Sequence, residues 1–129
     1  MRQVVWMIDD CPLTLKIAKV RLRSLGAEIY AMPSGREAFG AWMNGSAPRP
    51  SVILVNPDVH SGDGLAACKM LRDAGCSNPI HLLADPTGAD IGPETASAFV
   101  DGILVKPVST DSFASMLSAT AARLFKPAA

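Results

Sequence analysis

The sequence lacks most of the features that mark membrane, secreted and nucleic-acid-binding proteins. Its 12 basic and 12 acidic residues balance to a formal net charge of zero, and no basic run favours nucleic acid or an anionic membrane as a partner. No apolar run reaches the length of a membrane span, and the strand-like residues after Met1 do not resemble a signal peptide. We therefore expect neither a nucleic-acid partner nor a membrane partner.

Cysteine is also scarce. Cys11, Cys68 and Cys76 are odd in number and lack zinc-ribbon spacing, which favours reduced thiols and a cytoplasmic location. Hydrophobic residues make up 49% of the chain and charged residues 19%, a balance typical of globular proteins. The 129 residues suit one domain, which we expect at residues 1–125. Residues 126–129 would then be a C-terminal tail, either a natural end or a truncated linker.

The stretch Val52–Val55 organises the rest of the chain. Its four consecutive apolar residues predict a strand that is buried on both faces, as in the centre of a parallel sheet. The strand must stop near Asn56, because Pro57 has no amide to donate to a neighbouring strand. Ligand sites in open parallel sheets lie beyond the carboxyl ends of the strands. Asn56 therefore lies where chemistry is expected.

Similar apolar runs alternate with amphipathic segments along the chain. They predict strands at residues 4–8, 27–31, 52–55, 79–84 and 102–105, and helices at residues 12–25, 34–44, from 64 to about 74, from about 94, and from about 109. The helix near Glu94 must be short and begin late, because prolines and glycines precede it. The alternation predicts an α/β fold: a single doubly wound (βα)5 domain, flavodoxin-like, with parallel sheet order 2-1-3-4-5.

The first of these helices begins at Pro12, where the missing amide does no harm, and it stops at Gly26. The helix carries basic residues on its outer side. Its core-facing apolar stripe is predicted to consist of Leu13, Ile17, Val20 and Leu25.

Polar side chains gather where the predicted strands end. Asp9 and Asp10 follow the first strand, Asn56 the third and Lys106 the fifth. These ends meet at one edge of a sheet with the predicted order. Two carboxylates and a third oxygen ligand suit Mg²⁺, and an ammonium beside them would complete a phosphoryl site. Alternatively, the two acids could cap the helix that begins at Pro12, and Lys106 could be an ordinary solvated lysine. Of the two interpretations of Lys106, we favour the one in which its charge neutralises Asp9 and Asp10, whose mutual repulsion would otherwise raise a pKa.

In this order and spacing, the motifs at the strand ends resemble the receiver domains of bacterial two-component response regulators, over essentially the whole chain. The motifs are Ile8-Asp9-Asp10, the apolar strand with its loop ending in Asp63-Gly64, and Leu104-Val105-Lys106-Pro107. The resemblance implies a signalling domain of a phosphorelay. In that family, an aspartate at the place of Asn56 accepts a phosphoryl group from a histidine kinase.

The resemblance also implies roles for the residues around Asn56. Asp10 would be the main Mg²⁺ ligand, Asp9 a supporting acid, and the backbone carbonyl of Asp58 a further ligand. Lys106 would contact the phosphoryl oxygens, and its bond to the following proline would be cis. Because Asn56 offers a neutral carbonyl in place of a carboxylate, we expect Mg²⁺ binding to be weak if it occurs. No other cofactor is expected.

Five residues depart from the family pattern. Asn56 replaces the phosphoacceptor, and an amide is not a usable nucleophile toward phosphorus. Ala84 stands where the family has a hydroxyl that contacts the phosphoryl group, and Ile103 where it has an aromatic residue that changes rotamer on activation. Asp85 adds negative charge at the mouth of the pocket. His60 takes a loop position that is usually proline.

We therefore favour a pseudo-receiver that is not an enzyme and that binds a protein partner through strand four, strand five and the last helix. The partner could be a histidine kinase, an output protein, the protein's own output domain or a second copy. One alternative is a phosphorylatable receiver in which Asn56 is an engineered change or another acid, such as Asp58, is the acceptor. Another is a phosphatase of the haloacid dehalogenase type, although that family needs Asp-x-Asp after the first strand. We expect Cys11 to have a packing role, because the nearby carboxylates disfavour a thiolate.

Overall fold

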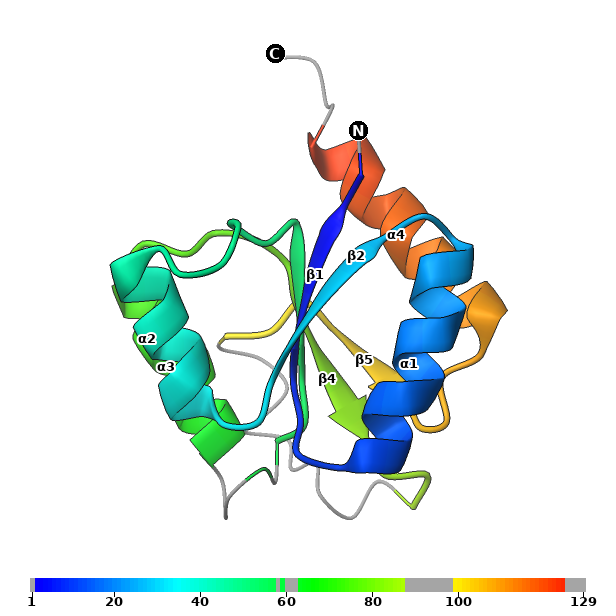
Figure 1. The fold of residues 1–129 in the computed structure, drawn as a ribbon, viewed down its shortest axis with the longest axis horizontal. Coiled ribbons are helices and arrows are strands. Elements are labelled where there is room, and N and C mark those ends of the chain that lie inside the picture. The colour runs from blue at the N-terminus through cyan, green and yellow to red at the C-terminus, as the bar shows by residue number, and fades with distance from the viewer. Residues whose placement is uncertain (1, 58, 60–62, 88–98, 125–129) are drawn as a thin grey trace.

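The computed structural model describes residues 2–57, 59, 63–87 and 99–124 (Figure 1). The strands are β1 (Val4–Ile8), β2 (Glu28–Met32), β3 (Val52–Val55), β4 (Ile80–Ala84) and β5 (Gly102–Val105). The helices are α1 (Pro12–Ser24), α2 (Gly35–Asn44), α3 (Asp63–Asp73) and α4 (Thr110–Leu124). The additional helix predicted near Glu94 lies outside the described residues.

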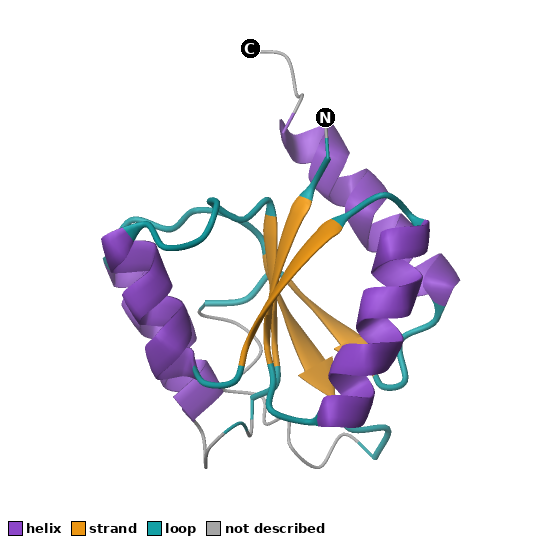
Figure 2. Cartoon of the chain, in the orientation of Figure 1, coloured by secondary structure: helices purple, strands orange, loops and turns teal. Residues whose placement is uncertain are grey.

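All five strands form one parallel sheet in the order β2-β1-β3-β4-β5. Helices α1 and α4 cover one face of this sheet, and α2 and α3 cover the other (Figure 2). The predicted fold class and strand order are thus confirmed. Three strands have the predicted bounds, while β2 is shifted by one residue and β4 begins one residue later.

The central strand β3 is buried along its whole length, as its continuous apolar run predicts. Alternate residues of the sheet contribute to two cores, one on each face. Trp6 and Ile53 lie in the core beneath α2 and α3, and Met7 and Leu54 lie in the core beneath α1 and α4. All four side chains are fully buried, so the two layers of helices are held by the same central strands.

The core-facing stripe predicted for α1 is wrong at three of its four positions, and the fourth, Ile17, is partly buried. Leu13 and Val20 are each 65% exposed, and Leu25 follows the helix and is exposed as well. The helix instead buries Ala18 and Leu22, which lie one turn apart on another face. Apolar residues occupy so many positions of α1 that two stripes satisfy the helical period, and packing against the sheet selects the one containing the small Ala18 side chain.

Helices α1 and α3 end in the same way. Gly26 and Gly75 follow them with φ angles of 83° and 96°, a region that glycine adopts without steric cost. The amide of each glycine and the amide after it bond back to carbonyls of the last helical turn. These turns direct the chain into β2 and β4.

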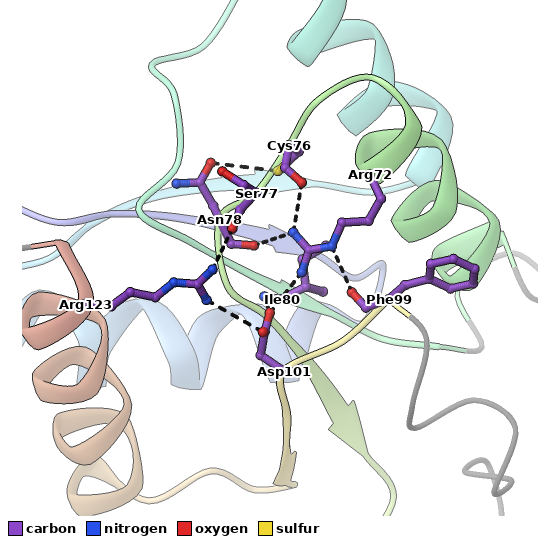
Figure 3. A network of polar contacts seen from close by, with 8 residues as sticks. All are labelled: Arg72, Cys76, Ser77, Asn78, Ile80, Phe99, Asp101 and Arg123. Atoms are coloured by element: carbon purple, nitrogen blue, oxygen red, sulfur yellow. Dashed lines mark hydrogen bonds and ion pairs between the residues drawn. The ribbon is translucent and has the colours of Figure 1, made fainter. Parts of the chain in front are cut away.

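An arginine network ties the start of β4 to α3, β5 and α4 (Figure 3). Arg72 of α3 donates to the Asp101 carboxylate at 2.9 Å, and Asp101 also accepts the Ile80 amide at 2.9 Å. Arg123 of α4 lies 3.6 Å from the same carboxylate. The backbone carbonyls that also accept from Arg72 are those of Phe99, Cys76 and Asn78. The network therefore fixes the end of the sheet opposite the candidate site.

Candidate functional site

The site is built around Asp9, the residue that follows β1. Its side chain is fully buried, although buried carboxylates are rare unless they are paired. Asp9 Oδ1 accepts the Cys11 amide at 2.9 Å and the Asn56 side-chain amide at 3.3 Å. Asp9 Oδ2 lies 3.2 Å from Lys106 Nζ, an ion pair that lacks the alignment of a hydrogen bond. One carboxylate thus joins the ends of β1, β3 and β5.

Lys106 reaches Asp9 from the turn that follows β5. The Lys106–Pro107 peptide bond is cis, as the resemblance implied. The Arg21 guanidinium of α1 donates to the carbonyl of Val108, which holds the next part of the same loop against α1. Only 22% of the Lys106 side chain is exposed. The ammonium therefore forms an ion pair with the buried carboxylate, in line with the neutralising role that we favour for Lys106 from its charge.

Asn56 continues the sheet beyond the end of β3, since its amide donates to the Ile8 carbonyl at 2.8 Å. The structure brings its side chain to Asp9, while the neighbouring Asp10 is exposed. Gly64 permits this arrangement, because a Cβ there would lie 2.2 Å from the Asn56 carbonyl oxygen. Asp58, the predicted carbonyl ligand, lies outside the described residues, as does His60.

The structural role of Asp63 was not anticipated from the sequence. Its carboxylate accepts the backbone amides of Gly35 at 2.9 Å and Arg36 at 3.2 Å, so it satisfies amide groups at the start of α2. Acids are favoured at that end of a helix. The two segments are far apart in the chain, and no local pattern reveals this contact. Asp63 thereby links the loop that follows Asn56 to α2.

The last residue of β4 and the residues that follow it form another side of the site. Ala84 is buried and offers no hydroxyl. Asp85 is exposed, and its carboxylate accepts from both the amide and the hydroxyl of Thr87. These hydrogen bonds lower the pKa of Asp85, and the charge of Lys106 contributes in the same direction. Asp85 therefore keeps a negative charge at the mouth of the site.

Cys11 is partly exposed at the start of α1, beside Asp9. Hydrogen bonding with Thr14 lowers the pKa of the Cys11 thiol, and the charge of Asp9 raises it by a smaller amount. The expectation that carboxylates dominate at this thiol is therefore wrong, because local hydrogen bonds outweigh them. All three cysteines are free, and burial raises the pKa of Cys68 to about 11.

The carboxylates near Asn56 are candidate ligands for a cation in the described part of the chain. No group of three or more His, Cys, Asp and Glu side chains that could hold a metal ion is found there. Both oxygens of Asp9 face positively charged or donor groups, and Asp10 is exposed. The Asp9 and Asp10 carboxylates and the Asn56 side-chain oxygen are of the donor types that Mg²⁺ takes, so the residues present are chemically compatible with this ion.

The fold and the site define a doubly wound α/β domain with acids after β1, a polar residue after β3 and a lysine after β5, all at one edge of the sheet. The sequence model of the response regulator receiver domain matches residues 5–118, and the chain belongs to this family. Its members are signalling modules of two-component systems. Among curated proteins, no match to the chain is found.

Solved receiver domains share the fold at low sequence identity. A CheY-like receiver domain from Methylobacillus flagellatus is 21% identical, with a TM-score of 0.79 over 93% of this chain and 99% of that chain. The receiver domain of Francisella response regulator 1452 is 20% identical, with a TM-score of 0.77 over 95% of this chain and 99% of that chain. The N-terminal domain of a response regulator/sensory box/GGDEF three-domain protein from Carboxydothermus hydrogenoformans is 17% identical, with a TM-score of 0.80 over 96% and 97%.

Proposed function

We propose that this receiver domain is a protein-interaction module that is not phosphorylated at the usual position. The observation that carries the proposal is the contact between the Asn56 side-chain amide and the buried Asp9 carboxylate. The lone pairs of an amide are delocalised, so Asn56 cannot attack phosphorus as a carboxylate does. In this chain, the position of the nucleophile carries a hydrogen-bond donor to an acid.

The surroundings of Asn56 disfavour phosphoryl transfer further. Ala84 cannot bond a phosphoryl oxygen, and the Asp85 carboxylate repels an incoming phosphate from the mouth of the site. The Lys106 ammonium, which would stabilise the phosphoryl group, is already paired with Asp9. A phosphodonor would therefore meet neither a nucleophile nor a complete set of stabilising groups.

The two side chains that usually change position when a receiver domain transmits a signal are also absent from this chain. Position 84 has no hydroxyl that could be pulled toward a phosphoryl group, and Ile103 has no ring that could move in response. A modification shifts a conformational equilibrium only by its differential interaction with the two states. We identify no such difference here, so the partner-binding surface is proposed to stay in one state.

Any Mg²⁺ binding is proposed to be weak, at millimolar concentration or above. Asp10 would be the main ligand, with Asp9, the Asn56 side-chain oxygen and the backbone carbonyl of Asp58 as further ligands. Replacing a carboxylate by an amide lowers the formal ligand charge by one unit, which costs about one to a few kcal/mol at intermediate dielectric. Lys106 Nζ already supplies a positive charge beside Asp9. No other cofactor and no catalytic activity are proposed.

The surface formed by β4, β5 and α4 is the proposed docking face. A groove of about 460 Å³ runs between β5 and α4, and Ile103 and Val105 of β5 are exposed at 42% and 55%. A histidine kinase, an output protein, an output domain of the same protein or a second copy would bind there. The Carboxydothermus hydrogenoformans relative is the N-terminal domain of a three-domain protein, which supports an attached output domain as one arrangement.

We place the domain at residues 1–125 and the protein in the cytoplasm. In the described part of the chain, no helix combines the length and apolar character that crossing a bilayer requires. Neither nucleic acid nor a membrane is a proposed partner, in keeping with the balanced charge of the sequence.

Intact-protein mass spectrometry after incubation with acetyl phosphate and Mg²⁺ tests this proposal. The unmodified chain is expected to keep its mass, while the Asn56→Asp variant, which regains a nucleophile, is expected to be labelled slowly at most. A phosphoryl adduct on the unmodified chain would instead favour a shifted acceptor such as Asp58. A magnesium titration of the same two proteins adds a second readout, and micromolar binding to the unmodified chain would contradict weak binding.

A further inference from the structure

Strand β2 is an outer strand of the sheet and has one edge that no other described strand covers. The amide of Glu28 donates to the Gln3 carbonyl, and the carbonyl of Met32 accepts the Asp9 amide. Residues Glu28 and Met32 therefore direct these backbone groups toward β1. Because alternate residues of a strand bond to opposite sides, Ile29 and Ala31 direct their amides and carbonyls toward the open edge.

A groove of about 670 Å³ follows this edge. One wall is α1, which contributes Lys19 and Arg23, and the other is α2, which contributes Gly40. A Cβ at Gly40 would meet nothing within 4 Å, so this wall leaves open space. A second hollow of about 480 Å³, which shares Arg23 with the first, continues beside the beginning of β2. The edge therefore has room along its length for an extended segment.

The two walls differ in charge. Helix α1 carries no acidic residue in its 13 positions, and its basic residues are Lys16, Lys19, Arg21 and Arg23. The α2 wall carries small side chains at Gly40 and Ala41, with Glu37 as an acid. A strand added beside β2 would direct alternate side chains toward α1 and α2, because its side chains have a period of two.

We propose that the free edge of β2 binds an extended acidic segment of a partner protein by strand addition. The backbone of the segment would pair with the outward groups of Ile29 and Ala31. Acidic side chains at every second position would face Lys19 and Arg23, and the side chains between them would lie over Gly40. This inference does not depend on the chemistry of Asn56, and the β2 edge is at the opposite side of the sheet from β5.

Charge argues against a second copy as the occupant. Two copies of β2 paired antiparallel would be related by a two-fold axis perpendicular to the sheet. That symmetry places both α1 helices on the same face, next to each other, so that Lys19 and Arg23 of one copy approach those of the other. The repulsion between these cations disfavours the dimer, whereas an acidic segment would form favourable contacts with the same cations.

The test uses the full chain and a capped Glu-Val-Glu-Val-Glu-Val-Glu peptide as the probe, with the Lys-Val counterpart for comparison. The acidic peptide is expected to shift the backbone amide resonances of Ile29 and Ala31 and to slow their hydrogen exchange. The Lys-Val peptide is expected to bind at least about tenfold more weakly, a difference of about 1.4 kcal/mol. Equal affinity of the two peptides, or no shift of these amides at millimolar peptide, would overturn the proposal.

Variants of α1 distinguish recognition of charge from non-specific peptide binding. Reversing both wall cations, in Lys19→Glu with Arg23→Glu, is expected to weaken acidic-peptide binding at least about tenfold. The matched control is Lys16→Glu, since Lys16 is exposed on the same helix but does not line either hollow. Its affinity should remain within about twofold of the unmodified chain. Equal losses in the control and the double variant would contradict recognition at the β2 edge.

A backbone variant tests strand addition itself. Ala31→Pro removes the outward amide of an exposed edge residue and leaves the bonds between β2 and β1 in place. If circular dichroism shows that it is folded, acidic-peptide binding should fall at least about tenfold. If it does not fold, hydrogen exchange of the Ile29 and Ala31 amides in the unmodified chain decides the question. Peptide-bound protein that shows no added protection at these amides, or a dimer through β2 in sedimentation, would overturn the proposal.

Discussion

Removing the ammonium of Lys106 is expected to leave the fully buried Asp9 carboxylate without its charge partner. At 3.2 Å and an effective dielectric constant of about 20, the direct attraction between the two charges is about 5 kcal/mol. Because the Lys106 side chain is 22% exposed, water screens much of this attraction, and the desolvation cost of Asp9 offsets a further part. We therefore expect Lys106→Met to lower the free energy of unfolding by about 2 kcal/mol.

Urea unfolding of a double-mutant cycle measures this coupling. The cycle comprises the unmodified chain, Lys106→Met, Asp9→Asn and the double variant, and it is expected to give a coupling energy of about 1–3 kcal/mol. Added Mg²⁺ should restore part of the stability lost in Lys106→Met, because a ligand that binds only the folded state stabilises it. A coupling energy below about 0.3 kcal/mol would show that Lys106 is an ordinary solvated lysine and would refute the reasoning.

Three further changes test the packing of the domain by urea unfolding. Burial lowers the pKa of His81, so the stability contributed by its neutral side chain is complete above pH ~6.5 and is lost as the pH falls below that value. Between pH ~7.5 and pH ~5.5, His81→Gln should therefore lose less stability than the unmodified chain. Equal losses in the two proteins would contradict this. Gly64→Ala brings a Cβ to 2.2 Å from the Asn56 carbonyl oxygen and should cost about 2–3 kcal/mol, whereas the control Gly40→Ala, with open space around it, should be neutral or stabilising by up to about 1 kcal/mol. Arg72→Met removes the side-chain donor to three backbone carbonyls and one of the donors to the Asp101 carboxylate, and it should cost about 2–4 kcal/mol. A loss under about 0.5 kcal/mol would show that water replaces the guanidinium.

The fold could be predicted from the sequence because burial restricts which residue types a strand can contain. A strand buried on both faces must be continuously apolar, and Val52–Val55 satisfies this requirement along its whole length. Strand order followed from chain connectivity rules rather than from any single residue. The orientation of α1 did not follow, because its apolar residues permit two stripes and only contact with the sheet distinguishes Leu22 from Val20.

The candidate site could be predicted in part for a related reason. Asp9, Asn56 and Lys106 all follow strands, so strand order alone brings them to one edge, and their contacts bear this out. The contact made by the Asp63 carboxylate could not be predicted in this way, because it caps a helix that begins 28 residues earlier in the chain. The pKa of Cys11 was also missed, since it depends on hydrogen bonds with Thr14 that charge counting ignores.

The central claim is that this receiver domain neither accepts a phosphoryl group nor switches its β5 surface. Backbone amide resonances of residues 103–106, recorded with and without acetyl phosphate and Mg²⁺, test it most directly, with Asn56→Asp measured in parallel. We predict unchanged resonances in the unmodified chain and, even in a labelled Asn56→Asp variant, little change at Ile103 and Val105. Phosphodonor-dependent shifts across β5 in the unmodified chain, together with a stable adduct mass, would contradict the claim.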